Sequence, residues 1–250
     1  MNELYNPFSL KSKTILVTGA SSGIGREVAL FCSKMGASLI ITGRNKDRLE
    51  ETLKSLEGDN NKAIVADLTE KEGINRIIEE TVKLDGVVLA AGIVEMAPVQ
   101  FATTDKFNKI FQTNLFSPIE LLRMITKKKL YNTGLSVVAI ASIAGNEDFV
   151  VGNSIYGAGK AALKSFLKFF SLEMAKKQIR VNTVSPGLIL TPMQTNGAVN
   201  DEDLEKAIEK IPMKRWGKPE DIAPAVAFLL SDLSSYMTGS DIKIDGGYTI

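Results

Sequence analysis

Short runs of apolar, often β-branched residues recur along the chain and alternate with longer segments in which apolar residues return every three or four positions. Short apolar runs are typical of buried strands, and the longer spacing is typical of amphipathic helices. The predicted strands cover residues 14–18, 38–42, 63–66, 86–90, 135–140, 179–184 and 241–244. The predicted helices cover residues 24–35, 47–56, 70–82, 106–129, 155–176 and 219–230.

This alternation of strands and helices predicts the fold class. Strands that are apolar throughout are buried on both faces, and helical crossovers make neighbouring strands parallel. We therefore expect an α/β fold, namely a Rossmann-type, doubly wound, seven-stranded parallel sheet with helices on both faces. Residues 1–250 are expected to form a single dinucleotide-binding and catalytic domain, because no linker-like stretch interrupts the pattern. An irregular stretch at about 188–215, with a short helix near 201–210, is expected to form a small substrate lid.

A glycine-rich loop follows the first predicted strand and leads into the first predicted helix. Glycines allow the sharp turn and let the backbone approach a pyrophosphate, while the free N–H groups and the dipole of the helix N-terminus favour negative charge. The loop therefore predicts dinucleotide binding by Gly19, Ser21, Ser22, Gly23, Ile24 and Gly25.

The end of the second predicted strand bears on which dinucleotide binds. A carboxylate there would hold the adenosine 2′-hydroxyl and repel a 2′-phosphate. In this chain Gly43 stands near the expected acid, Arg44 follows it, and no adjacent carboxylate opposes this arginine. An arginine suits a phosphate, so we expect NADP(H) to be favoured over NAD(H). The alternatives are that Arg44 is a solvated loop residue or stacks on the adenine.

Tyr156 and Lys160 are four residues apart on the predicted helix 155–176, so their side chains project from one face. The chain has no histidine and one cysteine, Cys32, which excludes histidine-dependent catalysis, an internal disulfide and most zinc or iron sites. Proton chemistry must use tyrosine, lysine, carboxylates or water. A lysine ammonium about 4 Å from a phenol lowers the phenol pKa by roughly 3 at an effective dielectric constant of about 20, so we expect Tyr156 to titrate at roughly pH 7.

Together these motifs resemble the short-chain dehydrogenase/reductase family, over nearly the whole chain. The matching positions, in the family's order and approximate spacing, are 18–25, Asp67, Ala90, Ala91, Gly92, Asn114, Ser142, Tyr156, Lys160, Pro186, Gly187, Thr191 and 245–247. The resemblance implies an oxidoreductase that transfers a hydride between a nicotinamide cofactor and a carbonyl/alcohol pair. The catalytic residues would be Asn114, Ser142, Tyr156 and Lys160, and we expect no metal site because the chain has no histidine and a single cysteine.

The resemblance also gives these residues individual roles. Ser142 would polarise the substrate oxygen, Lys160 would also bind the nicotinamide ribose, and Asn114 would hold a water linking Lys160 to solvent. Asp67 would bind the adenine amino group beside Leu68. The nicotinamide would lie against Pro186, Gly187, Ile189 and Thr191.

One part of the family's pattern is altered. Many relatives carry Asn-Asn-Ala-Gly where this chain has Leu89, Ala90, Ala91 and Gly92. The small residues Ala91 and Gly92 still permit a close approach to the cofactor ribose. We expect another polar group to hold the backbone that the asparagine side chain normally ties down.

The sequence leaves the substrate open. The expected pocket wall comprises residues 93–96, 144–153 and 188–195, with Met96, Phe149, Val150, Met193, Glu95, Glu147 and Asp148. By resemblance, a 3-oxoacyl thioester on an acyl carrier protein is the commonest substrate, and a sugar, a steroid or a small ketone is the alternative. A catalytically silent nucleotide-binding sensor would lack catalytic side chains that are present here. By resemblance, an enoyl reductase would need a longer tyrosine-to-lysine spacing.

Charge and hydropathy bear on which classes of partner the protein binds. The formal net charge is +1, with 30 lysines and arginines against 29 acids, which gives no field that attracts nucleic acid. No apolar run approaches the roughly 20 residues of a membrane span, and residues 1–13 lack the apolar core of a signal peptide. We therefore expect a cytoplasmic protein with no nucleic-acid or membrane partner. By resemblance, it would be a homodimer or homotetramer.

Overall fold

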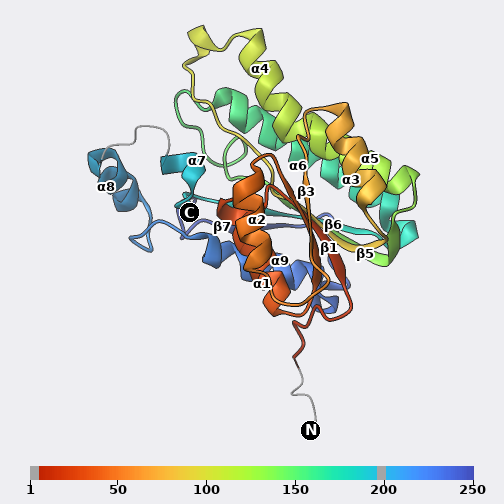
Figure 1. Ribbon diagram of the computed structural model, residues 1–250. Helices are drawn as coiled ribbons and strands as arrows, with labels where there is room; N and C mark the ends of the chain where they lie inside the picture. Colours follow the sequence, from red (N-terminus) through yellow and green to blue (C-terminus); the bar gives the residue numbers. More distant parts are fainter. Residues whose placement is uncertain (1–5, 196–200) are drawn as a thin grey trace.

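The computed structural model describes residues 6–195 and 201–250, and within these ranges seven parallel strands form one sheet (Figure 1). The strand order is β3-β2-β1-β4-β5-β6-β7, so the chain reverses its direction of travel between β1 and β4. This confirms the predicted doubly wound sheet. The strands are β1 (Thr14–Thr18), β2 (Ser38–Gly43), β3 (Lys62–Val65), β4 (Leu84–Leu89), β5 (Tyr131–Ile140), β6 (Arg180–Pro186) and β7 (Asp241–Ile244).

Helices cover both faces of the sheet and enclose two apolar clusters. One cluster packs α1, α2 and α9 on one face, and the other packs α3, α5 and α6 on the opposite face. These helices are α1 (Gly23–Lys34), α2 (Lys46–Lys54), α3 (Lys71–Glu80), α5 (Ser117–Lys127), α6 (Ser154–Met174) and α9 (Pro219–Leu230). Cys32 is fully buried among the apolar residues of α1, and this burial raises the pKa of its thiol to about 12, which fits a structural residue.

The predicted single helix 106–129 is corrected by the structure. It consists of α4 (Thr104–Phe111), a π-helical segment η2 (Gln112–Phe116) and α5. Pro118 stands at the start of α5 and has no N–H to donate to the carbonyl of Asn114, four residues earlier, so regular α-helical bonding fails there. Ser117 compensates in part, since its hydroxyl donates to the carbonyl of Gln112 at 2.6 Å. The widened turn carries Asn114.

The chain leaves the sheet after β6 and returns before α9. The excursion carries the short helices α7 (Pro192–Thr195) and α8 (Asp201–Lys210), beyond one edge of the sheet in Figure 1. Its two ends meet at Gly217, whose N–H donates to the carbonyl of Leu188 at 3.0 Å and whose carbonyl accepts from Leu190 at 2.9 Å. Trp216 is buried at this junction. The role of the excursion as a lid stays a prediction.

None of the described helices is long and apolar enough to cross a membrane.

Candidate active site

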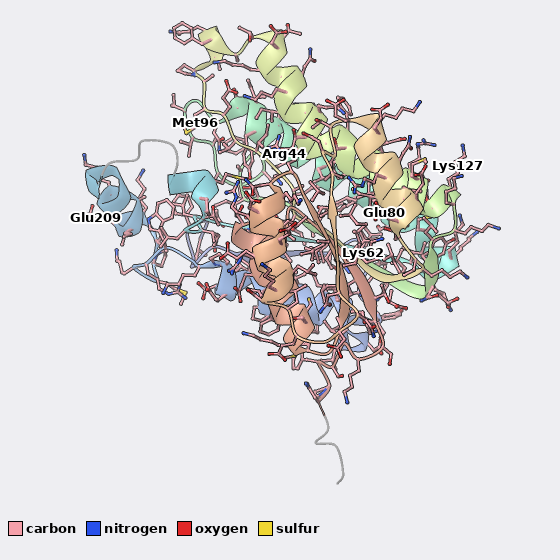
Figure 2. The ribbon with its side chains drawn as sticks, viewed as in Figure 1. Arg44, Lys62, Glu80, Met96, Lys127 and Glu209 are labelled. Atoms are coloured by element: carbon pink, nitrogen blue, oxygen red, sulfur yellow. The ribbon has the colours of Figure 1, made fainter. Side chains whose placement is uncertain are left out.

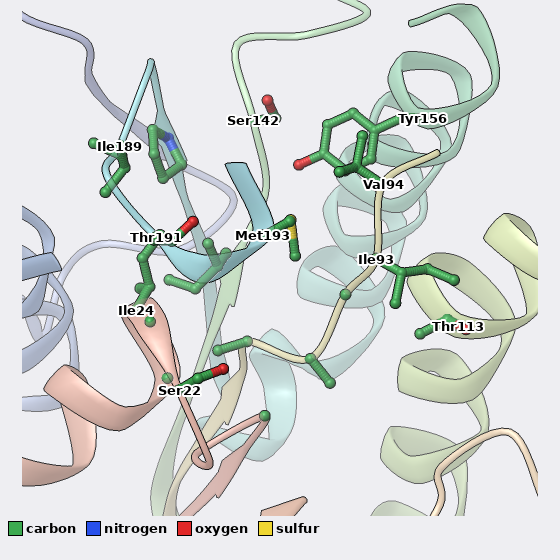
Figure 3. Close-up of a pocket in the computed structure, with 18 of the residues that line it drawn as sticks. Ser22, Ile24, Ile93, Val94, Thr113, Ser142, Tyr156, Ile189, Thr191 and Met193 are labelled. Carbon is green, nitrogen blue, oxygen red and sulfur yellow. The ribbon is translucent and has the colours of Figure 1, made fainter. Parts of the chain in front are cut away.

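A cavity of about 400 Å³ lies at the carboxyl ends of the central strands (Figure 3). In open parallel sheets this edge, where the strand order reverses, is where ligands bind. With the exception of Asn114, every predicted site residue lines this one cavity. These residues are Gly19, Ser21, Ser22, Gly23, Ile24, Gly25, Arg44, Asp67, Leu68, Ala90, Ala91, Gly92, Ser142, Tyr156, Lys160, Pro186, Gly187, Ile189 and Thr191. Their contacts to a cofactor stay predictions.

The glycine loop has the shape that a pyrophosphate requires. Gly19 has a φ of 68°, and a Cβ there would lie 2.8 Å from the Ala91 Cα, so only glycine fits where β1 turns past the end of β4. Ser22 is the N-cap residue of α1, and within the described chain its side chain makes no capping hydrogen bond to that helix. The N–H groups of the first turn are therefore available to an anion.

Thr18 is the polar group that holds the altered segment after β4. Its hydroxyl oxygen accepts hydrogen bonds from the N–H groups of Ala90 at 3.1 Å and Ala91 at 3.2 Å. The same hydroxyl donates to the carbonyl of Val88 at 3.3 Å. The expectation that another polar group would hold this backbone is confirmed. Its position directly before Gly19, at the end of the strand beside β4, is the signal that could have identified it.

Asn114 lies behind the cavity wall rather than in it. Its side chain is 1% exposed and is bonded twice to Ile93: the Oδ1 atom accepts from the backbone N–H at 2.9 Å, and the Nδ2 atom donates to the carbonyl at 2.9 Å. Asn114 thus fixes the segment that follows β4. A Cβ on Gly92 would lie 3.4 Å from Asn114 Oδ1 and 3.6 Å from Lys160 Nζ, so both side chains approach Gly92 closely. The water-holding role of Asn114 stays a prediction.

Ser142 and Tyr156 lie near each other in the cavity wall (Figure 3), and the Ser142 side chain is a hydrogen-bond partner of the Tyr156 phenol. The Ser142 oxygen accepts from the N–H of Ala144 at 3.0 Å, so its own proton remains available for donation. Burial raises the pKa of Tyr156 above its ordinary value, and the hydrogen bond with Ser142 opposes this only in part.

The expected titration of Tyr156 at roughly pH 7 is therefore wrong for this structure. The prediction placed the Lys160 ammonium beside the phenol, but its Nζ atom donates to the carbonyl of Ile140 at 2.7 Å and lies 5.8 Å from the centroid of the tyrosine ring. Burial also acts on the lysine itself, which is 5% exposed, and lowers the pKa of Lys160 to about 8. Near neutral pH the tyrosine therefore keeps its proton.

At the adenosine end, the structure corrects the expectation that no carboxylate opposes Arg44. The carboxyl ends of β2 and β3 are adjacent, with Gly43 opposite Val65, and Asp67 Oδ2 lies 3.7 Å from Arg44 Nη1. Burial acts to raise the pKa of Asp67, but hydrogen bonds from Thr69 and the charge of Arg44 outweigh it, so the pKa lies below its ordinary value. Arg44 is thus paired within the protein.

The structure also revises the pocket wall. Three residues expected in the wall, Glu95, Glu147 and Phe149, are not among the described residues that line the cavity. Glu95 pairs with Lys106 and Lys109, and Glu147 pairs with Lys243. Phe149 is 80% exposed. Of the other side chains expected there, Met96, Asp148, Val150 and Met193 do line it. Sequence reasoning missed the lining residues Asn45, Arg48, Thr69 and Thr113. Arg48 could have been found from its place four residues after Arg44, at the start of a predicted helix.

Comparison with known proteins finds a matching family model, similar curated proteins and similar solved structures. The family model described as enoyl-(acyl carrier protein) reductase matches residues 19–249. The 3-oxoacyl-[acyl-carrier-protein] reductase of Rickettsia conorii is 38% identical over 238 residues, covering 95% of this chain and 97% of the relative. Glucose 1-dehydrogenase of Gluconobacter oxydans is 30% identical over 246 residues, covering 95% and 92%. The structure described as a Pseudomonas aeruginosa RhlG/NADP active-site complex superposes with a TM-score of 0.91 at 30% identity, covering 99% of this chain and all of that one.

Proposed function

Because the chain belongs to the short-chain dehydrogenase/reductase family and is an NAD(P)-dependent oxidoreductase, we propose that it uses NADPH to reduce the 3-oxo group of an acyl thioester held on a carrier protein. The observation that supports this most is the convergence of Ser142, Tyr156 and Lys160 on the cavity that the glycine loop lines. The 3-oxoacyl-[acyl-carrier-protein] reductase of Rickettsia conorii supports the substrate class. The spacing of three residues between Tyr156 and Lys160 favours this reaction over enoyl reduction.

The residues divide the proton chemistry among them. When bound, the cofactor supplies a hydride to the carbonyl carbon of the substrate. Ser142 donates a hydrogen bond to the carbonyl oxygen and holds it beside the phenol. Tyr156, kept protonated by burial, gives its proton to that oxygen as the negative charge develops. Lys160 then supplies the proton that restores the phenol for the next turnover, and Asn114 holds a water through which Lys160 exchanges protons with solvent.

Arg44 supports NADP(H) over NAD(H) as the cofactor. It lines the cavity where β2 ends, and 63% of its side chain is exposed, so the guanidinium can meet a phosphate. The Pseudomonas aeruginosa complex, whose description names NADP, has the same fold along the whole chain.

We also propose a cytoplasmic homodimer or homotetramer. Several large apolar side chains on neighbouring helices are exposed, among them Phe116 at 51%, Phe169 at 67% and Leu172 at 75%, and a partner subunit would cover such surfaces. Light scattering tests the assembly, and a monomer at micromolar concentration would contradict it. Cell fractionation tests the location, and recovery with the membrane fraction would contradict it.

A panel of carbonyl and alcohol substrates tests the reaction. We expect kcat/KM to be highest for the reduction of a 3-oxoacyl thioester by NADPH, and lower for a steroid ketone, a small ketone, or a sugar offered with NADP⁺. The control is Ser142→Ala, which removes the hydrogen bond to the carbonyl oxygen and is expected to lower kcat by about 10²-fold without weakening NADPH binding. A preference for sugar oxidation, or no turnover of any carbonyl compound, would contradict the proposal.

A further inference from the structure

Arg44 and Asp67 form an ion pair at the adenosine end of the cavity, and the two side chains differ in how firmly they are held. Asp67 is anchored, since its Oδ1 atom accepts from the N–H of Thr69 at 2.9 Å and from the Thr69 hydroxyl at 2.7 Å. Its Oδ2 atom faces Arg44 Nη1 at 3.7 Å. The arginine side chain is 63% exposed against 35% for Asp67, and Figure 2 shows it at the surface beside α2. Arg44 is therefore the partner that can turn toward another anion.

The carboxylate at this end follows β3, and an acid at the end of β2 would crowd the glycine loop. A Cβ on Gly43 would lie 3.2 Å from the Ser21 hydroxyl oxygen and 3.3 Å from the Ser21 Cβ, so a larger residue would press against the glycine loop. The acid that would discriminate between the two dinucleotides cannot stand at Gly43 without moving Ser21. Asp67, on the neighbouring strand end, is the carboxylate that Arg44 meets.

A second arginine lines the same end of the cavity. Arg48 lies in the first turn of α2, where its backbone N–H donates to the Asn45 side chain at 2.9 Å. Nearby, Lys46 has its charge compensated by Glu50 at 3.8 Å. Arg48 meets no carboxylate within 4.0 Å in residues 6–195 and 201–250, and the dipole of α2 adds to its attraction for an anion.

These charges set up a competition. A phosphate and a carboxylate each bind the guanidinium fork of an arginine through charge-assisted hydrogen bonds, and the two anions repel each other. An adenosine 2′-phosphate must therefore draw Arg44 away from Asp67, whereas a 2′-hydroxyl leaves that pair intact. In the described residues, no carboxylate competes with a 2′-phosphate for Arg48.

We propose that Asp67 sets the preference between NADP(H) and NAD(H) by competing with the adenosine 2′-phosphate for Arg44, and that Arg48 is the second cation of the 2′-phosphate subsite. The inference rests on the proposed use of NADP(H). It makes Asp67 a positioning residue for Arg44, in addition to its expected contact with adenine.

The ratio of dissociation constants for NADH and NADPH, measured by fluorescence titration, tests this inference. Both dinucleotides carry the same adenine, so the ratio cancels any contact of Asp67 with that ring and reports the 2′-phosphate alone. An exposed ion pair contributes little, so Asp67→Asn is expected to raise the preference for NADPH by about two- to fivefold. Arg44→Gln is expected to lower the preference for NADPH by about tenfold. In the Arg44→Gln background, Asp67→Asn is expected to leave the ratio of dissociation constants unchanged.

Arg48 is tested against a matched control. Arg48→Gln is expected to lower the preference for NADPH several-fold with NADH binding unchanged, whereas Lys46→Gln, which removes a paired cation outside the cavity lining, is expected to leave the ratio as it is. Equal effects of these two variants would contradict the role of Arg48. Asp67→Ser is a second variant in case the asparagine form does not fold.

The outcomes separate this inference from the proposed function. A wild-type protein that binds NADH more tightly than NADPH contradicts both. A wild-type protein that prefers NADPH, but whose preference is unchanged by the Asp67 substitutions, contradicts the inference alone. An Asp67 effect that is equally large without Arg44 indicates direct repulsion of the phosphate and also contradicts it.

Discussion

Two buried ionisable side chains, Tyr156 and Lys160, decide the proton state of the cavity. Burial favours the uncharged form of each group, so the pKa of the phenol rises and the pKa of the ammonium falls to about 8. At neutral pH the tyrosine is protonated and the lysine is mostly charged. This state has a proton to give, so it suits carbonyl reduction more than alcohol oxidation.

The pH dependence of reduction follows from Lys160. Its pKa lies below the ordinary lysine value, so the ammonium is present below about pH 8 and is lost as the pH rises through about 8. We expect kcat for carbonyl reduction to be level up to about pH 7 and to fall above about pH 8, because a neutral Lys160 has no proton with which to restore the phenol between turnovers. Steady-state kinetics at saturating NADPH measure this profile. A rate that increases between pH 7 and 9 would contradict it.

Residues that act through local spacing could be predicted from the sequence, and residues that act through tertiary contacts could not. The Tyr156–Lys160 spacing and the glycine loop each lie within one segment, so their geometry follows from a single helix or turn. The Arg44–Asp67 pair joins two strand ends that become neighbours only in the sheet. The high pKa of Tyr156 depends on burial and on where Lys160 finds its acceptor, which no spacing specifies.

At the scale of elements, the strands were predictable because each is a short apolar run, and all seven strands found in the described residues match predicted runs, with ends shifted by up to a few residues. The helix after β4 was not predicted correctly. Its apolar spacing runs through α4, η2 and α5 without a break, and only Pro118 marks the place where the backbone bonding changes. A single proline near a helix start is also common in regular helices, so the π-helical segment left no distinct signal.

The contact between the ends of β1 and β4 depends on the Thr18 hydroxyl, which can be tested. Thr18→Val keeps the shape of the side chain but leaves the N–H groups of Ala90 and Ala91 without their acceptor. We expect a loss of about 1–3 kcal/mol in the free energy of unfolding and weaker NADPH binding. Thr18→Ser, which retains the hydroxyl, is the control. Urea unfolding and NADPH titration measure both effects, and a valine variant as stable as the serine variant would contradict this role.

At the scale of the whole molecule, the sheet brings the catalytic helix α6 to the cavity and holds it at successive turns. Lys160 bonds to the end of β5, and Lys164 pairs with Asp241 on β7 at 2.7 Å. The Asp241 carboxylate also accepts hydrogen bonds from Thr183 and Ser185 on β6. Three strands therefore fix the direction from which Tyr156 meets the cavity. The sequence predicted the helix but not this buried pair, because its partners are far apart along the chain.

Tyr156 as proton donor is tested most directly by single-turnover hydride transfer in Tyr156→Phe. The phenylalanine keeps the ring and its packing and removes the donated proton. With a 3-oxoacyl thioester and bound NADPH, we expect the rate of NADPH oxidation to fall by at least about 10²-fold, while the dissociation constant for NADPH stays within about twofold of the wild-type value. Hydride transfer at the wild-type rate in this variant would contradict the assignment of Tyr156.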